Sequence, residues 1–382
     1  MVLVDFYVHG HHAPYVRDLA QGLYDLGIKV TVIGPPELQE AGLGRFLVLE
    51  DCERLNSLDG LRRQLAAFPV CRRALARARD VKPTHIHFLY ADFHVSSIAM
   101  AWRFSRPEAN PVLTVHWIKG VGAGSAGVRN WFRRIPHRAA LRWFARQKGM
   151  RILVHHDTVA KSISRVIQPD KIGVIPYPNQ PMPEVEMESR LNFRKSLGVG
   201  SGDKLILCYG GTRFDKGADL AVKALARLAD NFHLLAAGRP LYFGTDCLRR
   251  QARDLGVDNR LHLLMKFLSD EETALVFYAC DVVLFPYRKI FSGQSGPLTQ
   301  AASIGKVAVV ADLSVLRKTV REYRLGRVFP AGDIEKMTEA LRAAVECNVQ
   351  QKNVDSFIAD HSPKAFAQAV YANYHFVSEN RG

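Results

Sequence analysis

A strand pattern, a glycine turn with two cations and a helix pattern follow one another directly in the middle of the chain. Residues 205–209 are an apolar run, residues 210–217 contain Arg213 and Lys216, and residues 218–229 have apolar side chains at helical spacing. The N-terminus of such a helix offers unpaired N–H groups and the positive end of its dipole. Arginine can bind phosphate through two parallel hydrogen bonds, and lysine adds a point charge. The sequence therefore predicts a diphosphate-binding turn in an α/β domain, against the alternative of an ordinary turn with two solvated cations.

A second strand–loop–helix unit lies further along the chain. Residues 281–288 contain an apolar run that ends in Pro-Tyr-Arg, and the small residues of 292–297 precede a helical pattern that begins at Leu298. The carboxyl ends of parallel strands meet at one edge of a sheet, and ligands of open α/β sheets bind at that edge. We therefore expect both loops to face one ligand.

The chain resembles the GT-B glycosyltransferases of group 1, the family-four-like retaining type, over nearly all of its length. The motifs that carry the resemblance are Arg-x-x-Lys-Gly at 213–217, Pro-Tyr at 286–287 with Gln-Ser-Gly at 294–296, the strand–loop–helix–strand unit of 2–33, the strand that ends at His116, and residues 172–179 and 259–272. Enzymes of this family transfer sugars from nucleoside diphosphate sugars. The resemblance implies an α/β chain with two Rossmann-like domains that face each other across a cleft, and a C-terminal helix that crosses back to the first domain.

The resemblance also divides the chain. Residues 1–180 are expected to form an acceptor-binding Rossmann-like domain, residues 189–362 a nucleotide-sugar-binding one, and residues 363–382 a helix that packs back on the first domain. A segment rich in Pro and Glu, residues 178–188, is the predicted linker. A chain of 382 residues with 48% hydrophobic residues is long and apolar enough to form two cores.

The donor that the resemblance implies is a UDP-sugar or a GDP-sugar, with no cofactor and no metal. We assign Arg213 and Lys216 to the departing diphosphate, and His116 to the transferred sugar. Most family members carry two glutamates in the second loop and its helix, where this chain has Ser292 and Gln300, which can bind hydroxyls without charge. The other residues expected around the donor are Gly10, Gly211, Gly238, Lys266, Gly293, Gln294, Ser295 and Gly296.

The first domain is expected to bind the acceptor. The residues assigned to the acceptor are His9, His11, Tyr15, His87, Asp92 and Trp117. His9, His11 and His12 could also be interpreted as metal ligands, but no nearby carboxylate or cysteine pair completes such a site. A retaining course needs no general base, because the departing phosphate can take the acceptor proton, whereas an inverting course needs Asp92 or His116 in that role.

The net charge of +15 indicates an acidic partner, and the positive charge is concentrated in one segment. Residues 109–156 contain nine Lys or Arg and no Asp or Glu. On a helix expected after Pro136, Arg138, Arg142 and Arg146 form one stripe. The apolar residues predicted on the other side are Ala140, Leu141 and Phe144. Arginines beside Trp and Phe suit the headgroup region of an anionic membrane, against the alternative of a solvated helix face, and no nucleic-acid-binding module accompanies them.

The sequence therefore predicts a metal-independent hexosyltransferase, retaining rather than inverting, whose acceptor is a glycan or a lipid-linked glycan of polysaccharide assembly. Six cysteines without paired spacing, and no recognisable signal peptide or membrane-spanning run, favour a cytoplasmic protein that binds the inner face of the membrane peripherally. Two alternatives stay open: a GT-B-like protein that binds a nucleotide sugar without transferring it, and an epimerase of similar shape. The oligomeric state, the sugar and the acceptor are left open.

Overall fold

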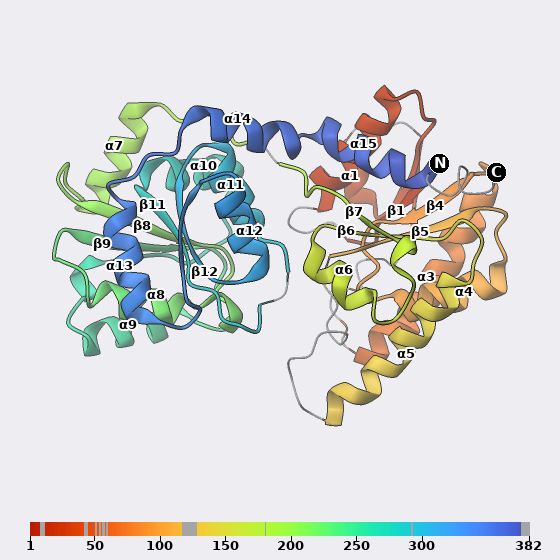
Figure 1. Ribbon diagram of the computed structural model, residues 1–382, viewed down its shortest axis with the longest axis horizontal. Helices are drawn as coiled ribbons and strands as arrows, with labels where there is room; N and C mark the ends of the chain where they lie inside the picture. Colours follow the sequence, from red (N-terminus) through yellow and green to blue (C-terminus); the bar gives the residue numbers. More distant parts are fainter. Residues whose placement is uncertain are drawn as a thin grey trace. The chain divides into compact units, whose positions relative to one another are not determined.

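The computed structural model describes residues 1–7, 12–41, 45–49, 52, 55, 58, 60–116, 128–179, 181–291 and 293–375. The chain divides into two compact units, one formed by Met1–Pro178 with Asp360–Gly382 and the other by Asn179–Ala359. Each unit has a parallel β-sheet with helices packed on it (Figure 1). The predicted α/β class with two Rossmann-like domains is confirmed.

The first unit contains a sheet of seven strands in the order β3-β2-β1-β4-β5-β6-β7. The strands are β1 (Val2–Val4), β2 (Thr31–Gly34), β3 (Arg45–Val48), β4 (His85–Phe88), β5 (Asn110–Val115), β6 (Arg151–Val154) and β7 (Ile172–Val174). The helices are α1 (His12–Asp25), α3 (Gly60–Arg79), α4 (Val95–Ser105), α5 (Val128–Ala145), α6 (Asp157–Ile163) and α15 (Pro363–His375). Val2 is paired with Thr31 on one side and Ile86 on the other, so β1 lies inside the sheet. Its three residues are all buried and apolar, as expected for a parallel strand with both faces covered.

The C-terminal helix α15 belongs to the first unit, which confirms the prediction that it returns there. Phe366, Ala367 and Val370 are buried in one cluster with apolar residues of α1. The contact with α1 is close, because a Cβ on Gly22 would lie 2.4 Å from the Cβ of Ala367. Tyr374 of α15 is also buried in this cluster.

Helix α5 differs from its prediction at its start. It begins at Val128, eight residues before Pro136, and continues through that proline. Proline lacks the N–H of a helical hydrogen bond, so the sequence pattern suggested a boundary where the helix in fact continues. The predicted apolar side is confirmed, because Ala140, Leu141 and Phe144 are all buried in the core of the first unit.

The second unit contains a sheet of six strands in the order β10-β9-β8-β11-β12-β13. The strands are β8 (Lys204–Tyr209), β9 (Phe232–Ala237), β10 (Leu261–Leu264), β11 (Val282–Phe285), β12 (Val307–Ala311) and β13 (Gly326–Phe329). The helices are α7 (Met187–Ser196), α8 (Ala218–Leu225), α9 (Thr245–Asp254), α10 (Asp270–Ala279), α11 (Gly296–Ser303), α12 (Ser314–Glu322), α13 (Ile334–Ala344) and α14 (Gln351–Asp360). Two apolar clusters cover this sheet and form the core of the unit.

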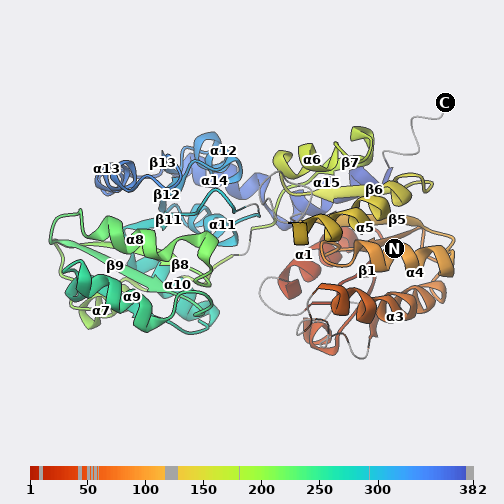
Figure 2. The same ribbon diagram turned by 90° about the horizontal axis from the view of Figure 1, so that it is seen from below.

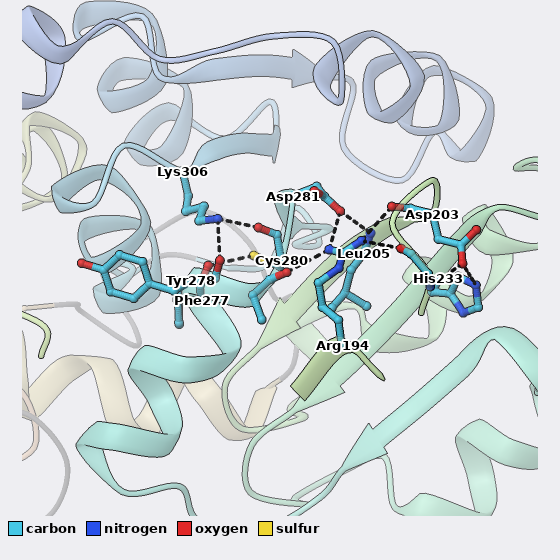
Figure 3. Close-up of polar contacts among 11 residues, drawn as sticks. Arg194, Asp203, Leu205, His233, Phe277, Tyr278, Cys280, Asp281 and Lys306 are labelled. Carbon is cyan, nitrogen blue, oxygen red and sulfur yellow. Dashed lines mark hydrogen bonds and ion pairs between the residues drawn. The ribbon is translucent and has the colours of Figure 1, made fainter. Parts of the chain in front are cut away.

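Polar contacts brace the amino ends of the strands in the second unit (Figure 3). Arg194 of α7 donates to the carboxylate of Asp281 at 2.9 Å and to the carbonyl of Asp203 at 2.8 Å. The same carboxylate accepts from the backbone N–H of Leu205 at 2.6 Å, and Lys306 donates to the carbonyls of residues 278 and 280. These contacts connect α7 to the starts of β8 and β11. The polar groups at the amino edge of this sheet therefore have a structural role.

Candidate functional site

The carboxyl edge of the second sheet brings the two predicted loops together. β8 and β11 are neighbours, while β9 and β10 extend from β8 on one side and β12 and β13 from β11 on the other. The strand order therefore reverses between β8 and β11, and such a switch point is where open α/β sheets bind ligands.

Glycines let the turn after β8 approach its neighbours closely. Gly217 has φ +69°, and a Cβ at this position would clash with the carbonyl oxygen of Pro286, which follows β11. Gly238 has φ +132°, and its Cβ would lie 2.5 Å from the carbonyl oxygen of Gly210. Residues with side chains are strained at such φ values, so these positions require glycine.

Lys216 is the cation whose surroundings are most suited to an anion. Its Nζ lies 5.5 Å from the ring centroid of the buried Tyr287 and beside the backbone of Gly210. No carboxylate in the described part of the chain forms an ion pair with it. Burial, and then the nearby charge of Arg213, lower the pKa of Lys216 to about 8. A cation that is poorly solvated and beside another cation gains strongly from a bound phosphate.

Arg213 has a different environment, because it already binds an anion within its own loop. Its Nε and Nη2 donate to the two carboxylate oxygens of Asp215 at 2.9 and 2.7 Å. The Arg213 side chain is 47% exposed and that of Asp215 is 22% exposed. The pair has no net charge, so Lys216 supplies the uncompensated positive charge of this turn.

Arg288, to which the sequence analysis gave no role, joins the two loops. Its guanidinium donates to the carbonyl of Phe214 at 2.5 Å and to the carboxylate of Asp219 at 2.6 Å. Its backbone N–H donates to the carbonyl of Asp215 at 2.8 Å. The sequence contains this arginine after β11, but its partners Phe214 and Asp219 lie 74 and 69 residues earlier in the chain, so no local pattern links them.

The second loop supplies the start of α11. Ser295 is the N-cap residue, and its Oγ accepts from the N–H of Leu298 and contacts the hydroxyl of Tyr287 at 3.1 Å. Gly293 and Gln294 lie in the segment that leads into this helix, Gly296 is its first residue, and Gln300 is on its second turn, half-buried. Ser292 lies outside the described residues. The geometry is that of a capped helix N-terminus beside a buried tyrosine and Lys216.

The segment after β9 braces the glycine turn. Thr212 accepts a hydrogen bond from the N–H of Leu241 at 3.0 Å and donates one to the carbonyl of Phe243 at 2.6 Å. A Cβ on Gly211 would lie 2.8 Å from Leu241. Lys266, after β10, forms an ion pair with Glu272 of α10 at 2.5 Å, so its ammonium group already has a partner.

In the first unit, His116 and Asp92 come together at the carboxyl edge of the sheet. The backbone N–H of His116 donates to the carboxylate of Asp92 at 3.1 Å, and its Nε2 donates to the carbonyl of Leu89 at 3.0 Å. Because a carbonyl only accepts, Nε2 carries a proton. His116 is 6% exposed, and its ring packs against Tyr90, with centroids 4.7 Å apart.

Two residues assigned to the acceptor lie in the interior of the first unit. His87 is fully buried, and its ring nitrogens are hydrogen-bonded to the hydroxyls of Tyr374 and Thr114, both at 2.7 Å. Tyr15 is 3% exposed, and its hydroxyl bonds to His155 at 3.0 Å. His87 has no ring nitrogen left for a ligand, and Tyr15 forms part of the contact with α15.

The same edge carries a His–carboxylate pair that the sequence analysis did not find. His12 Nδ1 lies 3.1 Å from the carboxylate of the buried Asp5, and the N–H of Tyr7 donates to the other oxygen of that carboxylate at 3.0 Å. The Tyr7 hydroxyl in turn lies 2.7 Å from Nε2 of His94. The short spacing of Asp5 and His12 was a usable signal. The predicted residues His9, Gly10, His11 and Trp117 lie outside the described residues.

Helices α3, α4 and α5 form a layer without a single acidic residue (Figure 2). α3 packs beside α4, and α4 beside α5. Among the side chains that the structure describes in this layer, the exposed arginines are Arg62, Arg72, Arg79, Arg103 and Arg142, with Arg146 directly after α5. Leu65, Met100 and Phe104 are exposed by 65, 48 and 67% among them. The layer thus combines positive charge with protruding apolar side chains. Arg138 is only half-exposed.

Two further properties concern the part of the chain that the structure describes. None of its helices is both long enough and apolar enough to cross a bilayer. None of its groups of His, Cys, Asp or Glu has three or more members arranged to hold a metal ion.

Two family models match the chain, one in each unit. The model of glycosyl transferases group 1 matches residues 189–359, which contain the glycine turn and the second loop. The model of glycosyltransferase family 4 matches residues 13–178, which contain His116 and Asp92.

Similar proteins agree with this assignment. An uncharacterized glycosyltransferase of Methanocaldococcus jannaschii is 24% identical over 175 residues, which are 43% of this chain and only 44% of that protein. The sucrose-phosphate synthase of Thermosynechococcus elongatus has a similar fold, with a TM-score of 0.76 and 15% identity over 99% of both chains. HepE of Anabaena, solved with UDP and glucose, has a TM-score of 0.66 and 16% identity over 99% of this chain and 98% of its own. With a family 4 domain followed by a group 1 domain, the chain belongs to the group 1 glycosyltransferases of GT-B fold.

Proposed function

We propose that the chain transfers a hexose from a UDP-sugar or GDP-sugar to a hydroxyl of a glycan or lipid-linked acceptor. The observation that carries this proposal is Lys216, a poorly solvated cation that forms no ion pair with a described residue, at the switch point of the second sheet. A nucleoside diphosphate is the ligand class that fits a glycine turn, two cations and a helix N-terminus. HepE, which shares the fold, was solved with UDP, so UDP is the first nucleotide to test.

The proposed mechanism follows from the charges that develop. Breaking the bond between the anomeric carbon and the phosphate places positive charge on the sugar and negative charge on the departing diphosphate. Lys216, Arg213 and the N–H groups of residues 293–296 would stabilise the diphosphate, and fixed charges of this kind supply large rate effects. His116 would contact the transferred sugar. A retaining course is favoured, because the departing phosphate can then accept the acceptor proton.

Transfer is expected to continue at an unchanged rate in the presence of a chelator. Lys216 and Arg213 provide fixed positive charge at the position where a metal-dependent enzyme holds a divalent ion. The measurement is nucleotide release from UDP-sugars and GDP-sugars in EDTA, repeated after magnesium or manganese is added. Complete loss in EDTA that either ion reverses would refute metal independence.

Affinity for UDP is expected to fall as the pH rises above about 8, the value to which burial and Arg213 lower the pKa of Lys216. The free protein loses the Lys216 proton above this pH, and binding of the diphosphate must restore it. The affinity should therefore fall by up to about tenfold per pH unit above the midpoint. Calorimetric titration between about pH 6.5 and 9.5 tests this, with Lys216→Arg as the control because arginine stays charged throughout. Identical profiles for the two proteins would show that Lys216 does not bind the diphosphate.

We further propose that the acceptor is presented at an anionic membrane, with the enzyme bound peripherally to the cytoplasmic face. The acid-free layer of α3, α4 and α5 supports this, since anionic lipids attract arginine and the interface accommodates exposed Leu, Met and Phe. A membrane-bound enzyme would reach a lipid-linked glycan directly. The six cysteines, all of them among the described residues, form no disulfide, which is consistent with a reducing compartment.

A further inference from the structure

We propose that Arg288 is a positioning residue for transfer, which holds the β8–α8 loop with Arg213 and Lys216 against the β11–α11 loop. The inference rests on the proposed function, because it concerns the same diphosphate site. No motif of the family resemblance included Arg288, and the inference depends on its contacts alone.

The contacts of Arg288 enclose the phosphate-binding turn. Its side chain donates to the carbonyl of Phe214, on the N-terminal side of Lys216, and to the carboxylate of Asp219, on the C-terminal side. Its guanidinium carbon lies 4.0 Å from the ring centroid of Phe214. Its backbone N–H binds the carbonyl of Asp215 at 2.8 Å. One residue of the second loop thus fixes the backbone before Lys216 and the first turn of the helix after it.

The neighbouring residue continues the same connection. Tyr287 packs against the ammonium group of Lys216, and its hydroxyl contacts the N-cap residue Ser295 at 3.1 Å. Lys216 therefore lies between a loop that Arg288 fixes and a ring that is tied to α11. A displacement of about 1 Å at a charged catalytic group is enough to reduce rates about a hundredfold.

Arg288 acts through these residues rather than as a phosphate ligand. Its ion pair with Asp219 is largely buried, with 19 and 15% of the two side chains exposed. Oδ1 of Asp219 is buried without a hydrogen-bond partner, so Arg288 is the group that compensates this carboxylate. Removing Arg288 would leave Asp219 unpaired on the helix that follows Lys216, and breaking one side of a buried pair is costly.

The test is calorimetric titration of the full chain with UDP and with GDP. Arg288→Ala is expected to weaken nucleotide binding at least about tenfold, and Arg288→Lys to recover part of the loss, because lysine keeps the charge but only one of the two directed contacts. Arg249→Ala is the matched control, since Arg249 forms an ion pair with Asp258 at 3.2 Å in the same unit. This control should bind nucleotide like the wild type.

The pH dependence separates positioning from a general loss of structure. The charged and titratable groups around Lys216 are Arg213 and Asp215 of its own loop, Cys208 of β8, Asp219 of α8, and Tyr287 and Arg288 of the second loop. Arg288→Ala leaves the negative charge of Asp219 uncompensated, so the midpoint of UDP binding should move to higher pH. In the double variant Arg288→Ala with Asp219→Asn, the midpoint of UDP binding should return to the wild-type value. Asp219→Asn alone should move this midpoint to lower pH.

The outcomes are distinct. If neither nucleotide binds the wild type, the proposed function and this inference both fail. If the wild type binds and Arg288→Ala binds equally well with an unchanged midpoint, the inference alone is overturned. Should Arg288→Ala fail to fold, Asp219→Asn breaks the same ion pair from the other side, and unchanged binding by that variant overturns the inference.

Discussion

Lys216→Ala is expected to reduce sugar transfer by about 30- to 1000-fold at saturating donor while the fold stays intact. One charged contact to a leaving group contributes about 2–4 kcal/mol to the barrier, and each 1.4 kcal/mol is about tenfold in rate. Lys216 forms no ion pair with a described residue, and its surroundings solvate it poorly. In the proposed mechanism, the departing diphosphate would compensate its charge.

Arg213→Ala is expected to reduce transfer as well, but less than Lys216→Ala. Arg213 is paired through two hydrogen bonds with Asp215, so its removal also uncovers a carboxylate next to the donor. Repulsion between this carboxylate and the diphosphate weakens donor binding, so we expect a larger change in KM for Arg213→Ala and a larger change in kcat for Lys216→Ala.

Lys223→Ala is the matched control for these variants. Lys223 is exposed on α8, the helix that follows the turn, and its removal changes the net charge by the same amount. The measurement is nucleotide release under saturating donor, with thermal unfolding to verify the fold. Near-normal turnover in both Arg213→Ala and Lys216→Ala would refute the assignment of the turn to the diphosphate.

The protein is expected to bind anionic liposomes in a salt-sensitive way, and the triple variant of Arg138, Arg142 and Arg146 to glutamine to bind about a hundredfold more weakly at low salt. Each arginine near an anionic surface contributes about 1 kcal/mol, and 1.4 kcal/mol is about tenfold in partitioning. Arg142 and Arg146 are exposed and should contribute most. Near 1 M salt, where the Debye length is about 3 Å, the difference should largely vanish.

The control for membrane binding is a second triple variant with the same net charge as the first. Arg249, Arg250 and Arg253 lie on α9 of the second unit, and their replacement by glutamine removes three charges from a different surface. Sedimentation with phosphatidylglycerol vesicles compares the two triple variants with the wild type. If all three proteins partition equally, the arginines at 138, 142 and 146 are only solvated, and the lipid-linked acceptor loses its main support.

Much of the fold was predictable because buried parallel strands form continuous apolar runs in this chain. The apolar runs within residues 205–209 and 281–288 were both predicted as strands, and they lie in β8 and β11. Element boundaries were less predictable. Helix α8 ends at Leu225 rather than at residue 229. Helix α5 continues through Pro136, because packing of its apolar side against the core outweighs the local cost of proline.

The candidate site was predictable where it depends on residues adjacent in sequence. Lys216 and its glycines follow one strand, so a single pattern identified them. Arg288 was missed because its contacts join loops that are distant in the sequence. The burial of His87 was missed because the sequence does not show that Tyr374 of α15 binds it. The paired state of Arg213 likewise depends on a side-chain geometry that a motif does not specify.

The most direct test of the central claim is nucleotide release from a panel of UDP-sugars and GDP-sugars, with anionic vesicles that carry extracted lipid-linked glycans as acceptor. The account predicts that the wild type releases UDP or GDP from at least one donor, with transfer of the sugar to the lipid fraction, and that Lys216→Ala does not. Binding of nucleotide sugars by the wild type without release or transfer across the panel would contradict it, and would favour a GT-B protein that binds a nucleotide sugar without transferring it.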